Sequence, residues 1–99
     1  MKIWAKTIKD HRIQQEVVQE FASARPSDIL GWTGILAELC KPLDVAVPVL
    51  LKKHISELRQ FSTTAFKQGD FMETIAFDSL VIEIFPEKKK ESKQEYFYS

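Results

Sequence analysis

The chain has 99 residues, a length that suits one domain. Hydrophobic residues make up 44% of it and aromatic residues 11%, a composition that excludes an intrinsically disordered protein. The 14 basic and 14 acidic side chains cancel, so the chain lacks the basic excess typical of nucleic-acid-binding proteins. The single cysteine, Cys40, excludes an internal disulfide framework, and no apolar run approaches the ~18 residues of a transmembrane helix. Because no signal segment follows Met1 either, we predict a cytoplasmic protein without a membrane partner.

The first 21 residues predict a β-hairpin. Residues 2–8 alternate with a period of two, which is typical of a strand. One face of this strand carries Ile3, Ala5 and Thr7, and the other carries Lys2, Trp4, Lys6 and Ile8. A polar loop over residues 9–12 follows, and Asp10 is a favourable turn residue within it. In the second strand, Ile13, Val17 and Phe21 are expected on one face and Val18 on the other.

The middle of the chain predicts two helices. Ser27 is the expected cap of the first helix, and Pro42 is expected to end it at about Lys41. Its apolar stripe, at spacings of three and four, consists of Ile29, Trp32, Leu36, Leu39, Cys40 and Leu43. A second helix is expected over residues 49–60.

The remaining segments complete an α+β fold. Residues 62–66 are strand-like, residues 71–75 form a weaker extended piece, and residues 80–85 predict a strand at the centre of the sheet. The order of elements indicates an N-terminal β-hairpin, two helices and C-terminal strands, in an antiparallel or mixed sheet with the helices on one face. We expect a single domain over residues 1–86, followed by a polar, flexible C-terminal tail over residues 87–99.

Few side chains are candidates for catalysis. Asp10 and His11 are the one plausible pair, but adjacent side chains in a hairpin loop diverge. His54 lies at the border of the apolar stripe of the second helix, which predicts a core-edge histidine with a hydrated nitrogen. Cys40 is expected to be a buried, unreactive thiol. Neither metal-ligand spacing nor a glycine-rich phosphate loop is present, so we expect no enzymatic activity, no metal and no cofactor.

A contact face on the sheet is the main functional candidate. If Ile3 packs against the helices, then Trp4, Lys6 and Ile8 of the first strand lie on the opposite face with Val18 of the second. An uncovered apolar patch of this kind usually marks a contact surface. A second copy of the chain, giving a homodimer, or an extended peptide would cover it. The expected function is therefore that of a binding or assembly module whose partner is a protein, either itself or another chain.

Binding of single-stranded nucleic acid is the alternative function. Lysines alternate with Trp4 on the first strand, a combination that binds bases by stacking and phosphates by charge. Residues 52–59 hold a second basic stretch. Against this alternative, Glu16 and Glu20 on the neighbouring strand reduce the positive potential. An enzyme built on Asp10 and its neighbour His11 ranks third.

Several short segments carry a resemblance to a known group of proteins. The chain opens with Met-Lys-Ile-Trp-Ala-Lys and continues with Ile-Lys-Asp-His over residues 8–11; Glu-Leu-Cys over residues 38–40 and Phe-Asp-Ser-Leu over residues 77–80 follow. These segments resemble a family of short uncharacterised bacterial proteins with an Ile-Trp-Ala-Lys N-terminal strand, across most of residues 1–85. The resemblance implies one compact domain, and it implies no activity, cofactor or partner.

Overall fold

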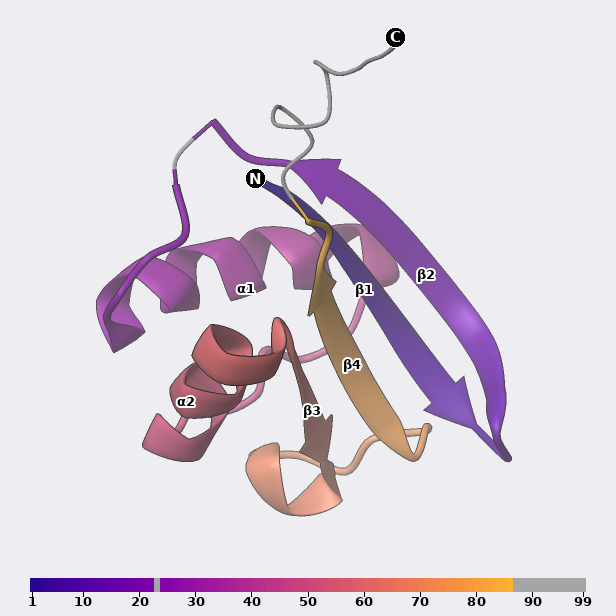
Figure 1. Cartoon of the computed structure of the whole chain (residues 1–99). Helices are drawn as coiled ribbons and strands as arrows, with labels where there is room; N and C mark the ends of the chain where they lie inside the picture. The colour runs from indigo at the N-terminus through magenta and orange to yellow at the C-terminus, as the bar shows by residue number, and fades with distance from the viewer. Residues whose placement is uncertain (23, 87–99) are drawn as a thin grey trace, which may run out of the picture.

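A four-stranded antiparallel sheet with strand order β2-β1-β4-β3 carries both helices on one face (Figure 1). This computed structural model describes residues 1–22 and 24–86. The elements are β1 (Lys2–Lys9), β2 (Arg12–Glu20), α1 (Ile29–Leu43), α2 (Lys52–Phe61), β3 (Thr63–Lys67), the 3-10 turn η1 (Gln68–Asp70) and β4 (Ser79–Ile84). The predicted α+β class is confirmed, with the N-terminal hairpin, the two helices and a central β4. The tail predicted over residues 87–99 lies outside the described residues.

A two-residue turn joins the strands of the N-terminal hairpin. Asp10 and His11 have φ values of 53° and 66°, and the flanking residues Lys9 and Arg12 are paired. Turns with positive φ at both central residues match the twist of a hairpin, and Asp and His are among the residues that tolerate this backbone region. The Asp10 N–H also donates to Asp78 Oδ2 over 2.9 Å, which ties the turn to the start of β4.

A β-bulge changes the faces of β2. Gln15 lies opposite Thr7, but Ile13 lies opposite Ile8, so one residue of β2 between them has no partner of its own. Because of the extra residue, the side chains between the bulge and the turn point to the opposite faces from those that strict alternation predicts. The prediction that Ile13 shares a face with Val17 is therefore wrong: Ile13 lies on the opposite face and is 45% exposed.

The N-terminus of α1 lies one residue later than predicted. Asp28, not Ser27, is the cap, and its Oδ1 accepts a hydrogen bond of 2.9 Å from the Gly31 N–H. The Trp32 indole N–H donates to the Pro26 carbonyl over 3.0 Å and fixes the incoming chain in this position. A Cβ atom at Gly31 would lie 2.6 Å from the Pro26 Cβ, so the close approach of this chain requires glycine.

The C-terminus of α1 passes the predicted end at Lys41, because the helix continues through Pro42. Pro42 has no N–H to donate to the carbonyl four residues earlier, and Leu43 is the one helical residue that follows it. Asp44, with φ 56°, then ends the helix: its N–H donates to the Lys41 carbonyl over 3.0 Å, and the Val45 N–H donates to the Cys40 carbonyl over 3.3 Å. These two hydrogen bonds together form a Schellman motif.

Two other segments differ from the sequence-based expectation because hydrogen bonds to residues outside each segment hold them. Residues 49–51 precede α2 and are not helical, and the Val49 N–H donates to the Asp70 carbonyl over 2.7 Å. The piece predicted as extended over residues 71–75 forms no strand. There the Gln68 side chain donates to the Glu73 carbonyl over 3.0 Å and accepts from the Ile75 N–H over 3.1 Å, which closes a loop.

The core lies between the inner face of the sheet and the two helices. It combines Ile3 and Ala5 of β1, Leu80, Ile82 and Ile84 of β4 and Phe66 of β3 with Trp32, Ile35, Leu36, Leu39, Cys40 and Leu43 of α1 and Ile55 and Leu58 of α2. Cys40 is buried within it, as predicted. Neither helix of the described chain is long and apolar enough to span a membrane.

Candidate functional site

The face of the sheet that points away from the helices, here called the outer face, brings the predicted contact residues together. Val18 on β2 lies directly opposite Trp4 on β1, and Glu83 lies on the other side of Trp4. Lys6 and Ile8 follow at alternate positions of β1, so all four predicted residues share this face. We refer to Trp4, Lys6, Ile8 and Val18, together with Ile13 and Phe85, as the contact face.

Trp4 is held in one orientation by three neighbours. Its indole N–H donates to Glu16 Oε1 over 2.8 Å. The ammonium group of Lys6 lies 3.5 Å from the centre of the Trp4 ring, and the Phe85 ring stacks nearly parallel, with 6.2 Å between the ring centroids. The Trp4–Phe85 pair extends the apolar surface from the hairpin to the end of β4.

Carboxylates balance the basic charge of this face. Lys6 Nζ lies 3.5 Å from Glu83 Oε1 across the β1–β4 pair. The ammonium group of Lys2 lies 5.6 Å from the centre of the Phe85 ring. The lysines therefore contact aromatic rings and a carboxylate of the same face, which reduces the positive potential that a nucleic-acid strand would meet.

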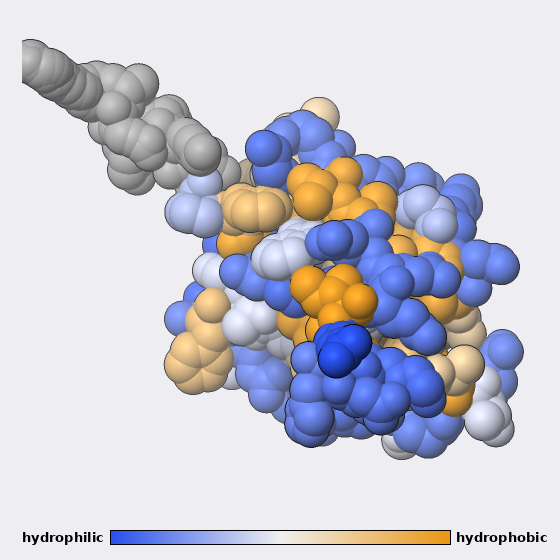
Figure 2. Space-filling model, turned by 90° about the vertical axis from the view of Figure 1, so that its right-hand side faces the viewer, coloured by the Kyte–Doolittle hydropathy of each residue, from blue (hydrophilic) through white to orange (hydrophobic). Residues whose placement is uncertain are grey.

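Exposed apolar side chains remain on the face. Val18 is 51% exposed and Ile13 is 45% exposed. Figure 2 shows the side of the molecule that lies on the right in Figure 1, where apolar patches alternate with charged and polar surface. Sequence periodicity found Val18 but not Ile13, because a bulge gives no signal in a single sequence.

The residues weighed as catalytic do not form a cluster. Asp10 and His11 are exposed at the tip of the hairpin turn, where the two side chains leave a strongly twisted backbone. Burial raises the pKa of the Cys40 thiol to about 11, so the reactive thiolate is disfavoured at neutral pH. Within the described residues, no three histidine, cysteine, aspartate or glutamate side chains gather as a metal site would require.

His54 is fully buried, so the predicted core-edge position with a hydrated nitrogen is wrong. Its Nδ1 accepts a hydrogen bond of 2.9 Å from the Leu51 N–H, which places the proton of the neutral ring on Nε2. The Phe66 ring lies 4.3 Å away between centroids, and Nε2 lies 3.6 Å from Asp70 Oδ2. Burial lowers the pKa of His54 below 6.5, and the Asp70 carboxylate opposes this shift in part.

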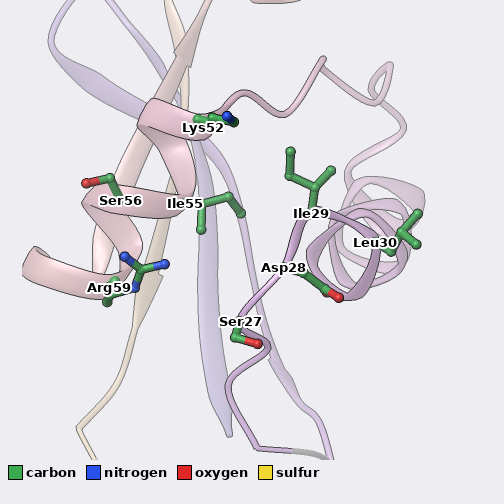
Figure 3. Close-up of a pocket in the computed structure, with 8 residues that line it drawn as sticks. All are labelled: Ser27, Asp28, Ile29, Leu30, Lys52, Ile55, Ser56 and Arg59. Atoms are coloured by element: carbon green, nitrogen blue, oxygen red, sulfur yellow. The ribbon is translucent and has the colours of Figure 1, made fainter.

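An open groove of about 620 Å³ between α1 and α2 is a second candidate site (Figure 3). Residues 27–30 line it on one side, and Lys52, Ile55, Ser56 and Arg59 line it on the other. In the close-up, Lys52, Ile55 and Arg59 extend from α2 toward the groove, whereas Leu30 points away from it. The basic stretch was visible in the sequence, but the groove was not, because its two walls come from separate segments.

Comparison with known proteins identifies no relative of this chain. No protein-family model, no curated protein and no solved structure matches the chain. The geometry of the contact face and the chemistry of its residues are therefore the basis for a proposed function.

Proposed function

We propose that this protein is a small, non-enzymatic binding or assembly module that contacts a protein partner through the contact face. The observation that carries the proposal is the combination of exposed Val18 and Ile13 with the Trp4–Phe85 stack. Among the described residues, both helices pack on the other side of the sheet, so this apolar surface faces solvent. A second copy or another protein chain would remove it from water.

The composition of the contact face favours a protein partner over a nucleic acid. Base stacking needs an open aromatic ring and cations that are free to meet phosphates. Here Lys6 covers the Trp4 ring and approaches Glu83, while Glu16 accepts the indole N–H. An apolar centre with a rim of balanced charge is instead the usual anatomy of a protein interface. Weak binding of single strands through Trp4 and Lys6 remains the alternative function.

The first prediction tests the contact face by removing the Trp4 side chain at its centre. We expect the native protein to have a molar mass above that of the 11.5 kDa monomer, and Trp4→Ala to lower this mass. The physical reason is the loss of the aromatic anchor that a partner would pack against. Light scattering after size exclusion measures the mass, and circular dichroism checks that the variant is folded.

Phe61→Ala is the matched control, because Phe61 is an exposed aromatic residue at the end of α2, outside the contact face. It should leave the molar mass unchanged. Labelled single-stranded DNA and RNA, titrated at low salt, should show no binding at micromolar protein. Binding of these strands by a monomeric protein, weakened by Lys6→Ala and by added salt, would replace the proposal with the alternative function.

A further inference from the structure

The edge of β2 is a backbone surface that is separate from the side chains of the contact face. β2 is the last strand in the sheet order and pairs with β1 alone. It forms the right-hand border of the sheet in Figure 1. Gln14 is the bulge residue without a partner on β1, and residues 15–20 run beyond it as one regular stretch opposite β1.

The hydrogen bonds at the end of the hairpin show which groups of β2 face the open edge. Phe21 and Met1 exchange two backbone bonds, of 2.7 Å and 2.8 Å. In an antiparallel pair such bonds recur at every second residue, so odd-numbered residues of β2 bond to β1. The N–H and C=O groups of Glu16, Val18 and Glu20 therefore point away from the sheet, and nothing within residues 1–22 and 24–86 pairs with them.

The two edges of the sheet differ in how they are protected. At the opposite edge, β3 has only five residues, and the N–H of its last residue, Lys67, donates to Asp70 Oδ2 over 3.0 Å. Proteins usually block an edge with short strands, lysine, proline or bulges. Beyond the bulge at Gln14, residues 15–20 read Gln-Glu-Val-Val-Gln-Glu and contain no lysine, no proline and no further bulge. This edge is open to a further strand.

We propose that β2 pairs antiparallel with β2 of a second copy, about a two-fold axis at Val17, to form a continuous eight-stranded sheet. A two-fold axis perpendicular to the sheet passes midway between one residue and the same residue of the second copy, and it keeps the helices of both copies on the same face. The axis at Val17 aligns the outward-facing groups of Glu16 with those of Val18 of the partner subunit. This inference goes beyond the contact face, because backbone groups of the edge provide the interaction.

Charge disfavours the two registers that lie next to this one. An axis at Glu16 would place Glu16 opposite Glu16 of the partner subunit, and an axis at Val18 would place Glu16 opposite the partner's Glu20 twice. Like charges directly opposite one another destabilise a strand pair. The axis at Val17 brings Gln14, the bulge residue at the end of the regular stretch, next to the partner's Glu20, a carboxamide donor beside a carboxylate, and it creates no like-charge pair.

Gln19 provides a second observation at the same edge. Its Oε1 is buried and has no hydrogen-bond partner among the described residues. With the axis at Val17, Gln15 of the partner subunit lies opposite Gln19 on the inner face. A rotation of the Gln19 side chain toward that carboxamide would give the orphan oxygen an N–H donor, and a buried acceptor without a donor is costly.

Replacing Gln14 by a positive or by a negative residue tests whether the two-fold axis lies at Val17. Sedimentation equilibrium across a concentration series should show a dimer, and Gln14→Lys should tighten it because two new ion pairs form with Glu20. Gln14→Glu should weaken it, with a change in Kd of roughly two- to thirtyfold in each direction. Gln14→Glu combined with Glu20→Lys should restore the dimer. The same substitutions at Gln60, an exposed position of α2, should change nothing.

Two further readouts decide the outcome. Amide hydrogen exchange at Glu16, Val18 and Glu20 should slow as the protein concentration rises. A protein that stays monomeric across the series would overturn the edge pairing. A dimer that is lost with Trp4→Ala but indifferent to the charge at Gln14 would overturn it as well, while supporting the contact face. A dimer that responds to the charge at Gln14 but is unchanged by Trp4→Ala would support the edge pairing and count against self-association through the contact face.

Discussion

The buried ring of His54 couples folding to pH. In the unfolded chain a histidine binds a proton with a pKa near 6.5, whereas burial lowers the pKa of His54 in the folded state. Between the lowered folded value and 6.5, the unfolded chain therefore binds more protons than the folded protein. The free energy of unfolding is unaffected by this group above pH 6.5, and it falls as the pH decreases below that value.

We predict that urea unfolding between pH 5 and pH 8 shows this loss, at most about 1.4 kcal/mol per pH unit. His54→Asn should remove the dependence in this range, because its side-chain oxygen can still accept the Leu51 N–H but does not titrate. His11→Asn is the matched control at an exposed turn position and should keep the dependence. An unchanged pH profile in His54→Asn would show that other groups cause the effect.

The burial of Cys40 has a chemical consequence at the same scale. The thiol lies within the apolar stripe of α1, and desolvation raises its pKa to about 11. The thiolate is the nucleophile that attacks a thiol reagent, so we predict that the native protein reacts slowly and that the urea-unfolded protein reacts at the rate of a free thiol. Absorbance of the released chromophore measures both rates. Rapid modification of the native protein would reopen a redox role for Cys40.

At the scale of single elements, the caps show how local chemistry and chain position combine. Ser27 and Asp28 are both good N-cap residues, so residue type alone does not decide which of them caps α1. The bond from Trp32 to the Pro26 carbonyl decides between them, because it leaves Asp28 as the last extended residue before the helix. The α2 helix depends on its surroundings even more: Arg25 donates to the Leu58 carbonyl at its C-terminus over 3.1 Å.

We predict that Asp28→Ala lowers the free energy of unfolding by about 1 kcal/mol, the usual value of an N-cap side chain. The loss arises because the Gly31 N–H no longer has the Asp28 carboxylate as its acceptor. Ser27→Ala, one residue earlier, should change stability by much less. Denaturant unfolding of the two variants measures the difference. Equal losses in both would contradict the assignment of the cap.

At the scale of the whole molecule, the fold leaves its sheet covered unequally. In the described part of the chain, both helices pack on the inner face, where the side chains of β1 and β4 are almost fully buried. The outer face keeps exposed Val18 and Ile13, and the edge of β2 keeps unpaired backbone groups. The two surfaces are adjacent, so one assembly could use both, and the variants at Trp4 and Gln14 separate their contributions.

The sequence by itself determined the elements whose signal is periodic. Alternation over β1 and the apolar run of β4 identified strands, and the stripe of α1 correctly placed Cys40 in the core. These patterns are local, since each residue's face follows from its position in a strand or helix. The same alternation brought Trp4, Lys6, Ile8 and Val18 to one face before any tertiary contact was known.

Only the tertiary structure decided the features that depend on distant segments. The bulge in β2 moved Ile13 to the outer face. The sequence pattern of α2 placed His54 at the border of the apolar stripe, but Phe66 and Asp70 enclose its ring. The edge position of β2 also follows from the strand order of the sheet, because β4 pairs with the side of β1 that β2 does not occupy. Such contacts join residues far apart in the chain, and their energies depend on the packing of the whole fold rather than on local spacing.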